Sequence, residues 1–224
     1  MKKNNYKEVV LTGIHLASYG RDFQNINLSD AIILTCNYGF ERVRLGSLEP
    51  NIITEDFLNK ISACKNFIPS FHLSLQSGSD TVLRRMNRHY TTEMFENAVN
   101  LLRNYYPNCS ITTDIIVGFP GESEEEFSET LAFVEKIAFT KAHIFPYSIR
   151  KGTVAAKMSN QIHSSIKSER CKRLEAVCAM SRVQFMDKHI GQVLPVLFEQ
   201  KKDGLWEGYT ESYLPVLLSS SDDL

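Results

Sequence analysis

His72, Ser74 and Gln76 alternate with apolar residues over the segment 71–76. Side chains of a strand alternate between its two faces, so these three polar groups share one face. A strand of a parallel sheet that is covered by helices is usually apolar on both faces. An imidazole, a hydroxyl and a carboxamide at this spacing can instead hydrogen-bond a polar ligand. Because a turn of small residues follows, including Gly78, we expect a ligand to bind at the end of this strand.

Two further strands carry polar side chains on one face. Arg42 and Arg44 share a face of the segment 42–45, and Thr112 and Asp114 share a face of the segment 110–117. Buried charges must be paired, because an isolated buried charge is very costly. Two interpretations stay open: an internal ion pair of the Arg44–Asp114 type without a functional task, or an open polar lumen that holds a zwitterionic, hydroxyl-bearing ligand.

Strand and helix patterns alternate along most of the chain. Strands are expected at 8–13, 42–45, 71–75, 110–117 and 141–149, and helices at 28–38, 54–64, 79–86, 91–105, 123–137 and 167–188. We expect the strand at 8–13 to be buried. Such alternation predicts a parallel sheet with helices outside it and a ligand at the carboxyl ends of the strands. Glycines at four of these five ends are expected to let the backbone approach a ligand, or simply to form turns.

The pattern changes near residue 189. Three short strands separated by turn residues follow, which is typical of an antiparallel meander. We therefore expect two units, residues 1–188 and 189–224.

Composition excludes several classes of protein. The 25 Lys and Arg nearly balance the 26 Asp and Glu, so no global field indicates a nucleic-acid partner. The chain has no apolar run long enough to span a membrane and no signal peptide at its start, so we expect a cytoplasmic protein without a membrane partner. The five cysteines form no C-x-x-C pair and no disulfide framework; Cys171 and Cys178 share a helix face and read as packing residues.

Five motifs in order carry a family resemblance. They occupy residues 12–15 (TGIH), 42–50 (RVRLGSLEP), 76–80 (QSGSD), 114–122 (DIIVGFPGE) and 145–148 (FPYS). With them the chain resembles the radical S-adenosylmethionine (SAM) methylthiotransferases over nearly its whole length, most of all those that act on tRNA N6-threonylcarbamoyladenosine.

This resemblance implies a fold and two cofactors. The fold is α/β: a partial (β/α) radical-SAM-type barrel that lacks its first strand, followed by a small, truncated antiparallel β module of the TRAM type. The cofactors are S-adenosyl-L-methionine and [4Fe–4S] clusters. By position, Gly13 would meet the methionine amino group, and Ser74 and Gln76 the ribose or carboxylate. The residues implied to bind the cofactor are Gly13, Ser47, Glu49, Ser74, Gln76, Ser77, Asp114, Ile116, Gly118, Phe119, Pro120 and Tyr147.

Within that set, Ile116, Gly118 and the Phe119-Pro120 backbone would line the adenine, and Tyr147 would close the far side. The family also implies tRNA as a partner. Basic residues that could contact its phosphates are Arg84, Arg85, Arg88, Lys201 and Lys202. The alternative is that they form a solvated helix face and a solvated hairpin turn.

One departure from the family limits the prediction. The family holds its cluster with C-x-x-x-C-x-x-C, and no such triplet occurs in this chain. We therefore expect no metal ligands here, a fragment that is monomeric and inactive alone, and a missing amino-terminal portion supplied as a separate chain. No catalytic residue is assigned.

The resemblance implies transfer of a methylthio group to C2 of N6-threonylcarbamoyladenosine next to the anticodon. Two alternatives remain: a methylthiotransferase that acts on a ribosomal protein, and a non-catalytic RNA-binding barrel.

Overall fold

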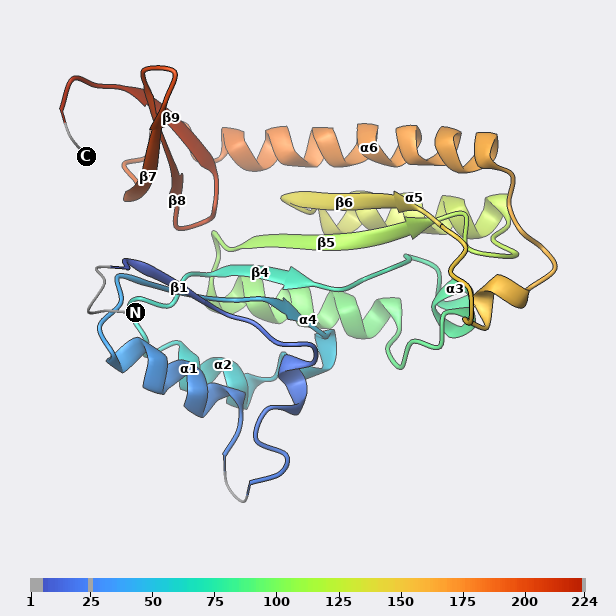
Figure 1. Cartoon of the computed structure of the whole chain (residues 1–224), viewed down its shortest axis with the longest axis horizontal. Coiled ribbons are helices and arrows are strands. Elements are labelled where there is room, and N and C mark those ends of the chain that lie inside the picture. The colour runs from blue at the N-terminus through green and yellow to red at the C-terminus, as the bar shows by residue number, and fades with distance from the viewer. Residues whose placement is uncertain (1–5, 24–25, 223–224) are drawn as a thin grey trace.

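Six parallel strands form the centre of the molecule (Figure 1). The computed structural model describes residues 6–23 and 26–222. Strand β1 (Glu8–Leu11) pairs with β2 (Arg42–Leu45), and β3 (Ser47–Leu48), β4 (Ser70–Leu73), β5 (Ser110–Val117) and β6 (Lys141–Pro146) follow in one sheet. A parallel bridge between Val43 and Phe67 joins the two groups. The α/β class and the parallel sheet are confirmed.

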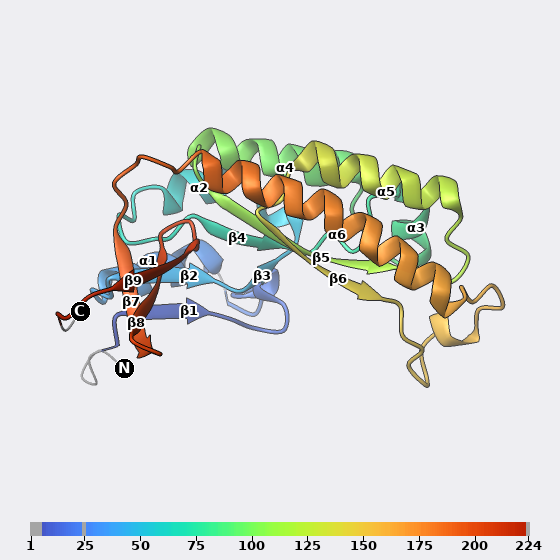
Figure 2. The same ribbon diagram turned by 90° about the horizontal axis from the view of Figure 1, so that it is seen from above.

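Helices connect the strands and cover one face of the curved sheet. They are α1 (Leu28–Asn37), α2 (Glu55–Ile61), α3 (Asp80–Arg85), α4 (Thr92–Tyr105), α5 (Glu124–Ile137) and α6 (Ser164–Asp187), with short 3₁₀ turns η2 (Leu16–Ser18), η3 (Pro50–Ile52) and η4 (Ala155–Lys157). Figure 2 shows α4, α5 and α6 side by side on the same side of the strands. None of the described helices combines the length and apolar character needed to cross a bilayer.

Local sequence signals set where helix α5 begins. The Ser123 hydroxyl accepts a hydrogen bond from the Glu126 amide at 3.2 Å, and the Glu126 carboxylate accepts one from the Ser123 amide at 2.9 Å. This reciprocal pair satisfies two backbone donors that the first helical turn leaves free. The three acidic residues of that turn also suit the helix dipole.

The core lies between the sheet and its helices. Phe71, Leu73 and Leu75 are all fully buried, which confirms the alternation that the sequence predicts for this strand. Cys171 and Cys178 of α6 are also buried in the core cluster, so their interpretation as packing residues is confirmed.

Two strand predictions were wrong in part. β1 was expected to be buried, but Val10 is 41% exposed, because among the described residues β1 has a strand neighbour on only one side. The strand expected at 141–149 ends at Pro146, although the Tyr147 amide still donates to the Val117 carbonyl at 2.8 Å.

A small antiparallel sheet lies at the amino ends of the parallel strands (Figure 1). Its strands are β7 (Val196–Lys202), β8 (Leu205–Thr210) and β9 (Pro215–Ser219), and we call it the β module. Arg42, only 7% exposed, donates to the carbonyls of Tyr209 at 2.8 Å, Thr210 at 3.3 Å and Pro195 at 3.2 Å. These bonds attach the β module to β2.

Candidate functional site

The turn after β4 is fixed by backbone bonds to β5. Gln76 has a positive φ of 69°. Its amide donates to the Asp114 carbonyl at 2.9 Å, and its carbonyl accepts from the Ile116 amide at 2.9 Å. A non-glycine residue in this conformation is uncommon and needs such support. The Gln76 side chain is therefore held beside Asp114 at the carboxyl edge of the sheet.

Four of the predicted residues line one cavity at this edge. Gln76, Asp114, Ile116 and Tyr147 share a cavity of about 470 Å³, which we call the edge cavity. The residues that complete its lining are Phe145, Pro146, Ser148, Arg150, Thr153 and Ala155. Mixed aromatic, aliphatic and hydrogen-bonding groups of this kind suit a nucleoside. The Tyr147 hydroxyl is buried without a hydrogen-bond partner in the described structure.

The loop after β5 is held by a buried carboxylate. Glu122 is 3% exposed, and its Oε2 accepts from the Gly118 amide at 2.7 Å and from Arg170 Nη1 at 2.8 Å. Phe119 packs edge-to-face on Tyr147, with ring centroids 5.3 Å apart. Phe119 and Pro120 are themselves buried, so they support the wall of the edge cavity from behind.

One predicted residue of the β4 turn, Ser77, does not line the edge cavity. Ser77 is fully buried, and its Oγ accepts from the Ser79 amide at 3.2 Å. A Cβ on Gly78 would lie 2.8 Å from Thr130 Cα, so the close approach of α5 requires this glycine. Close packing against α5 therefore explains the small residues of this turn without any ligand.

Tyr90 fixes the same turn, and no sequence motif pointed to it. Its hydroxyl donates to the carbonyls of Ser74 at 2.7 Å and Leu75 at 3.1 Å. Burial raises the pKa of Tyr90 to about 12, so this hydroxyl stays a donor at neutral pH. Tyr90 follows α3 in the sequence, and only the fold brings its hydroxyl back to the turn that precedes this helix.

The predicted residues near β1 and β2 lie apart from the edge cavity. Gly13 and Ser47 are exposed, and Glu49 faces His15 with Oε1 3.6 Å from Nε2. Ser74 is half-buried, and its amide donates to the Leu48 carbonyl at 3.1 Å. These residues follow the same edge of the sheet, but none of them lines the edge cavity.

The polar strand faces form a network inside the sheet. His72 Nδ1 lies 3.0 Å from Thr112 Oγ1, and His72 Nε2 lies 3.4 Å from Asp114 Oδ2. Burial lowers the pKa of His72, although Asp114 opposes the shift. The suggested Arg44–Asp114 ion pair was wrong: Arg44 Nε instead donates to Glu8 at 2.9 Å, since β1 lies beside β2.

The basic residues fall into two separate groups. Arg84 is exposed on α3, and Arg88 is half-buried. Arg85 donates to both Glu126 oxygens, at 2.8 and 2.6 Å, so its charge is already paired. Lys201 and Lys202 lie on the β7–β8 hairpin, at the opposite end of the molecule from α3 (Figure 1). The structure does not join the two groups into one patch.

The described cysteines do not fit a [4Fe–4S] cluster. They come from α1, the end of α2, the start of β5 and α6, and the described residues contain no group of three or more His, Cys, Asp or Glu that could hold a metal. Burial raises the pKa of Cys36 to about 12 and of Cys109 and Cys178 to about 11. Within the described residues, the thiols therefore do not converge on one site that could hold a cluster.

Comparisons with known proteins agree on the family. The model of the radical SAM superfamily matches residues 2–134. The chain is 37% identical over 226 residues to threonylcarbamoyladenosine tRNA methylthiotransferase MtaB of Bacillus subtilis (strain 168), covering 98% of this chain and 50% of that protein. It is 38% identical over 216 residues to tRNA-2-methylthio-N(6)-dimethylallyladenosine synthase of Staphylococcus aureus (strain JH9), covering 94% of this chain and 42% of that protein. The chain thus spans about half the length of these relatives.

Solved structures show the same fold at low sequence identity. Coproporphyrinogen III oxidase (HemN) of Escherichia coli, a radical SAM enzyme, superposes with a TM-score of 0.58 at 19% identity, over 78% of this chain and 40% of that one. Elp3 of the archaeon Methanocaldococcus infernus, without its first 46 residues, gives 0.53 at 11% identity, over 93% of this chain and 67% of that one.

Proposed function

The chain belongs to the radical SAM superfamily, and on that premise we propose that it is the cofactor-binding part of a tRNA methylthiotransferase. The proposed reaction adds a methylthio group to C2 of N6-threonylcarbamoyladenosine next to the anticodon. The observation that carries the proposal is the edge cavity, where Gln76, Asp114 and Tyr147 meet at the carboxyl ends of neighbouring strands. The 37% identity to MtaB over nearly the whole chain supports this substrate.

The edge cavity fits the nucleoside of S-adenosylmethionine. Ile116 and Tyr147 offer flat and aliphatic surfaces to adenine, while Asp114 and Gln76 can hydrogen-bond ribose hydroxyls. When it is bound, the cofactor supplies the radical chemistry, and the protein contributes orientation and the exclusion of water.

The cluster does not fit the described residues of this chain. For methylthio transfer, we propose that the cluster thiolates come from a second polypeptide. The exposed face of β1 and the fully exposed Ile14 beside it leave room for such a neighbour.

Contacts with tRNA are proposed at both ends of the molecule. Arg84 and Arg88 lie near the carboxyl edge, and Lys201 and Lys202 lie on the β module. Lysine and arginine side chains at separated points position a nucleic-acid backbone without reading its sequence.

Mass spectrometry of tRNA nucleosides from a strain that lacks the gene tests this function. We expect 2-methylthio-N6-threonylcarbamoyladenosine to disappear and N6-threonylcarbamoyladenosine to accumulate. If the deletion strain keeps the tRNA modification and the mass of a ribosomal protein changes instead, the chain belongs to a methylthiotransferase that acts on protein.

A second candidate function is a catalytically silent RNA-binding barrel. The described residues contain no group of three or more ligating side chains that could hold a cluster, which favours this candidate. Tight tRNA binding together with an unchanged nucleoside profile in the deletion strain would support this candidate.

A further inference from the structure

Two cysteines lie together at the ends of helices α1 and α2, which are side by side in Figure 1. Cys36 is the last residue but one of α1, and Cys64 comes three residues after the end of α2. The Asn66 side-chain amide donates to the Cys36 carbonyl at 3.1 Å and to the Phe40 carbonyl at 2.8 Å. These bonds attach the turn that carries Cys64 to the end of α1.

The thiols of Cys36 and Cys64 contact each other, and we call them the thiol pair. Burial, together with a hydrogen bond to the Cys64 thiol, raises the pKa of Cys36 to about 12. Cys36 is only 7% exposed, whereas Cys64 is half-buried. Cys36 therefore keeps its S–H proton as a donor toward Cys64, and Cys64 is the thiol that a reagent from solution can reach.

An aromatic wall lies beside the thiol pair. Burial raises the pKa of Tyr106 to about 12, and the nearby thiols of Cys64 and Cys36 raise it in the same direction. The Tyr106 ring packs against Phe67 and Phe71, with centroids 6.3 and 5.8 Å away. The thiol pair thus has a neutral, well-packed neighbour that does not compete with it as a base.

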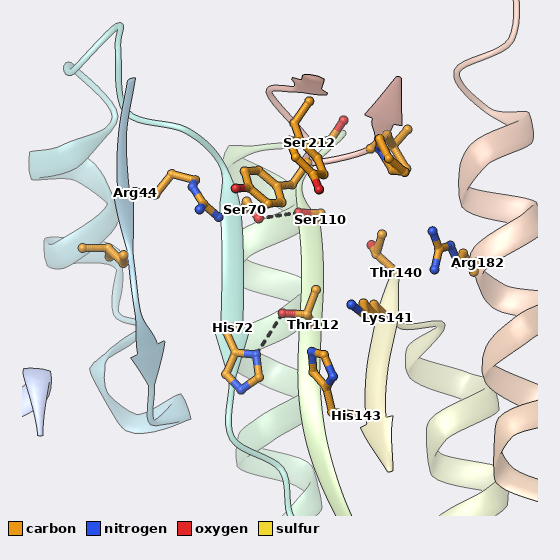
Figure 3. Close-up of a pocket in the computed structure, with 15 residues that line it drawn as sticks. Arg44, Ser70, His72, Ser110, Thr112, Thr140, Lys141, His143, Arg182 and Ser212 are labelled. Atoms are coloured by element: carbon orange, nitrogen blue, oxygen red, sulfur yellow. Dashed lines mark hydrogen bonds between the residues drawn. The ribbon is translucent and has the colours of Figure 1, made fainter. Parts of the chain in front are cut away.

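Strand contacts fix the backbone on both sides of the thiol pair. The Ser110 hydroxyl donates to the Ser70 hydroxyl at 2.8 Å, which ties the first residues of β5 and β4 together behind Tyr106 (Figure 3). The Asn66 carbonyl accepts from the Val43 amide at 2.9 Å, so the turn after α2 is also bonded to β2. The elements that carry the two sulfur atoms therefore stay neighbours in the folded chain.

We propose that Cys36 and Cys64 form a reversible intramolecular disulfide, which makes the thiol pair a redox modification site. The oxidant is a small disulfide of the glutathione class. The Cys64 thiolate attacks one sulfur of this reagent, which forms a mixed disulfide and releases one glutathione. Cys36 then attacks the Cys64 sulfur, and its proton leaves with the second glutathione. The chain loses two hydrogens and two electrons, which reduce the reagent to two thiols.

The pair on α6 cannot react in this way. Cys171 and Cys178 are seven residues apart on one helix, a rise of about 10 Å. Two cysteines whose Cα atoms are more than about 7 Å apart cannot be bridged without movement of the backbone. The contact between the ends of α1 and α2, and not the number of cysteines, therefore singles out Cys36 and Cys64.

Mass spectrometry of the intact 224-residue chain after incubation with oxidised glutathione tests the inference. We expect a loss of about 2 Da relative to the reduced chain, because one disulfide replaces two S–H groups. Proteolysis without a reductant should release one cross-linked peptide pair that contains Cys36 and Cys64. Dithiothreitol should restore the reduced mass.

Three single variants locate the bond. Cys64→Ser should keep its reduced mass, because the accessible thiol is gone. Cys36→Ser should stop at the mixed disulfide, since no second thiol is left to displace glutathione. Cys171→Ser on α6 is the matched control and should lose about 2 Da as the wild type does. Peptide mapping of the wild type decides the question if a variant does not fold.

Four results would overturn the inference. The wild type could keep its reduced mass, or it could accumulate the glutathione adduct without closing the second bond. The cross-linked peptides could contain other cysteines, or the loss of mass could persist in Cys64→Ser. Each result would show that the contact between Cys36 and Cys64 is only one of packing.

Discussion

Arg170 and Glu122 form an ion pair in which the Arg170 Nη1 and Glu122 Oε2 atoms are 2.8 Å apart and the side chains are 5% and 1% exposed. The same Glu122 oxygen accepts the Gly118 amide at 2.7 Å. Helix α6 therefore fixes the loop that supports the edge cavity, across a sequence separation of 48 residues.

Arg170→Met should destabilise the fold strongly. It leaves the Glu122 carboxylate buried without its partner, a change that costs about 3–5 kcal/mol in comparable buried pairs. The free energy of unfolding in urea measures the loss. Arg173→Gln removes an exposed partner of Glu124 on the same helix and should change that free energy by less than about 1 kcal/mol. Equal effects of the two substitutions would contradict a structural role for the buried pair.

Gly78→Ala should destabilise the β4 turn. The added Cβ would lie 2.8 Å from Thr130 Cα and 2.9 Å from Phe133 Cβ, so α5 must shift. Overpacking of this kind costs about 1–3 kcal/mol. Gly13→Ala is the control, because its Cβ would meet only Leu16 at an ordinary 3.5 Å. The thermal unfolding midpoints of the two variants are compared with that of the wild type. A Gly78→Ala midpoint equal to the wild-type value would refute the close approach of α5.

Tyr90→Phe should loosen the turn that holds Gln76. The substitution removes a hydroxyl that donates to two backbone carbonyls, at 2.7 and 3.1 Å. Loss of such a buried donor costs about 1–3 kcal/mol. Hydrogen exchange of the Gln76 amide should accelerate together with the loss of stability. Tyr19→Phe, at an exposed tyrosine, should alter neither measurement.

His72 should make stability depend on pH. Burial lowers its folded pKa below the usual 6.5, so the unfolded chain binds the proton more readily. The contribution is fully present above pH 6.5 and is lost as pH falls through the folded pKa. Urea unfolding measured from pH 7 downward should show this loss, and His72→Gln should remove part of it. His89→Gln, at an exposed histidine, should leave the slope as it is; identical slopes in all three proteins would exclude His72 as a source.

Asp114→Asn should weaken nucleoside binding in the edge cavity. We expect the affinity for S-adenosylhomocysteine to fall by about tenfold, because a carboxylate that accepts ribose hydroxyls is replaced by a weaker acceptor. Calorimetry compares this variant with Asp187→Asn at the end of α6. The assignment of Asp114 fails if both variants bind as the wild type does.

The sequence predicts much of this architecture because its signals are local. The alternation over 71–75, the helix at 123–137 and the strand at 110–117 each depend on neighbouring residues, and each is found in the structure. The partner of Arg44 was wrong because it depends on the register of two strands, which spacing within one strand does not reveal. Tyr90 was missed because its contacts are with backbone carbonyls 15 and 16 residues earlier in the chain, which no local pattern reveals.

The contact that attaches the β module does not depend on the side chains of that module. Arg42 bonds three main-chain carbonyls and no side chain of that module. Main-chain carbonyls are present whatever residues the module carries. Substitution of side chains on β7 and β8 therefore leaves these three bonds in place, whereas loss of the Arg42 guanidinium removes all of them at once.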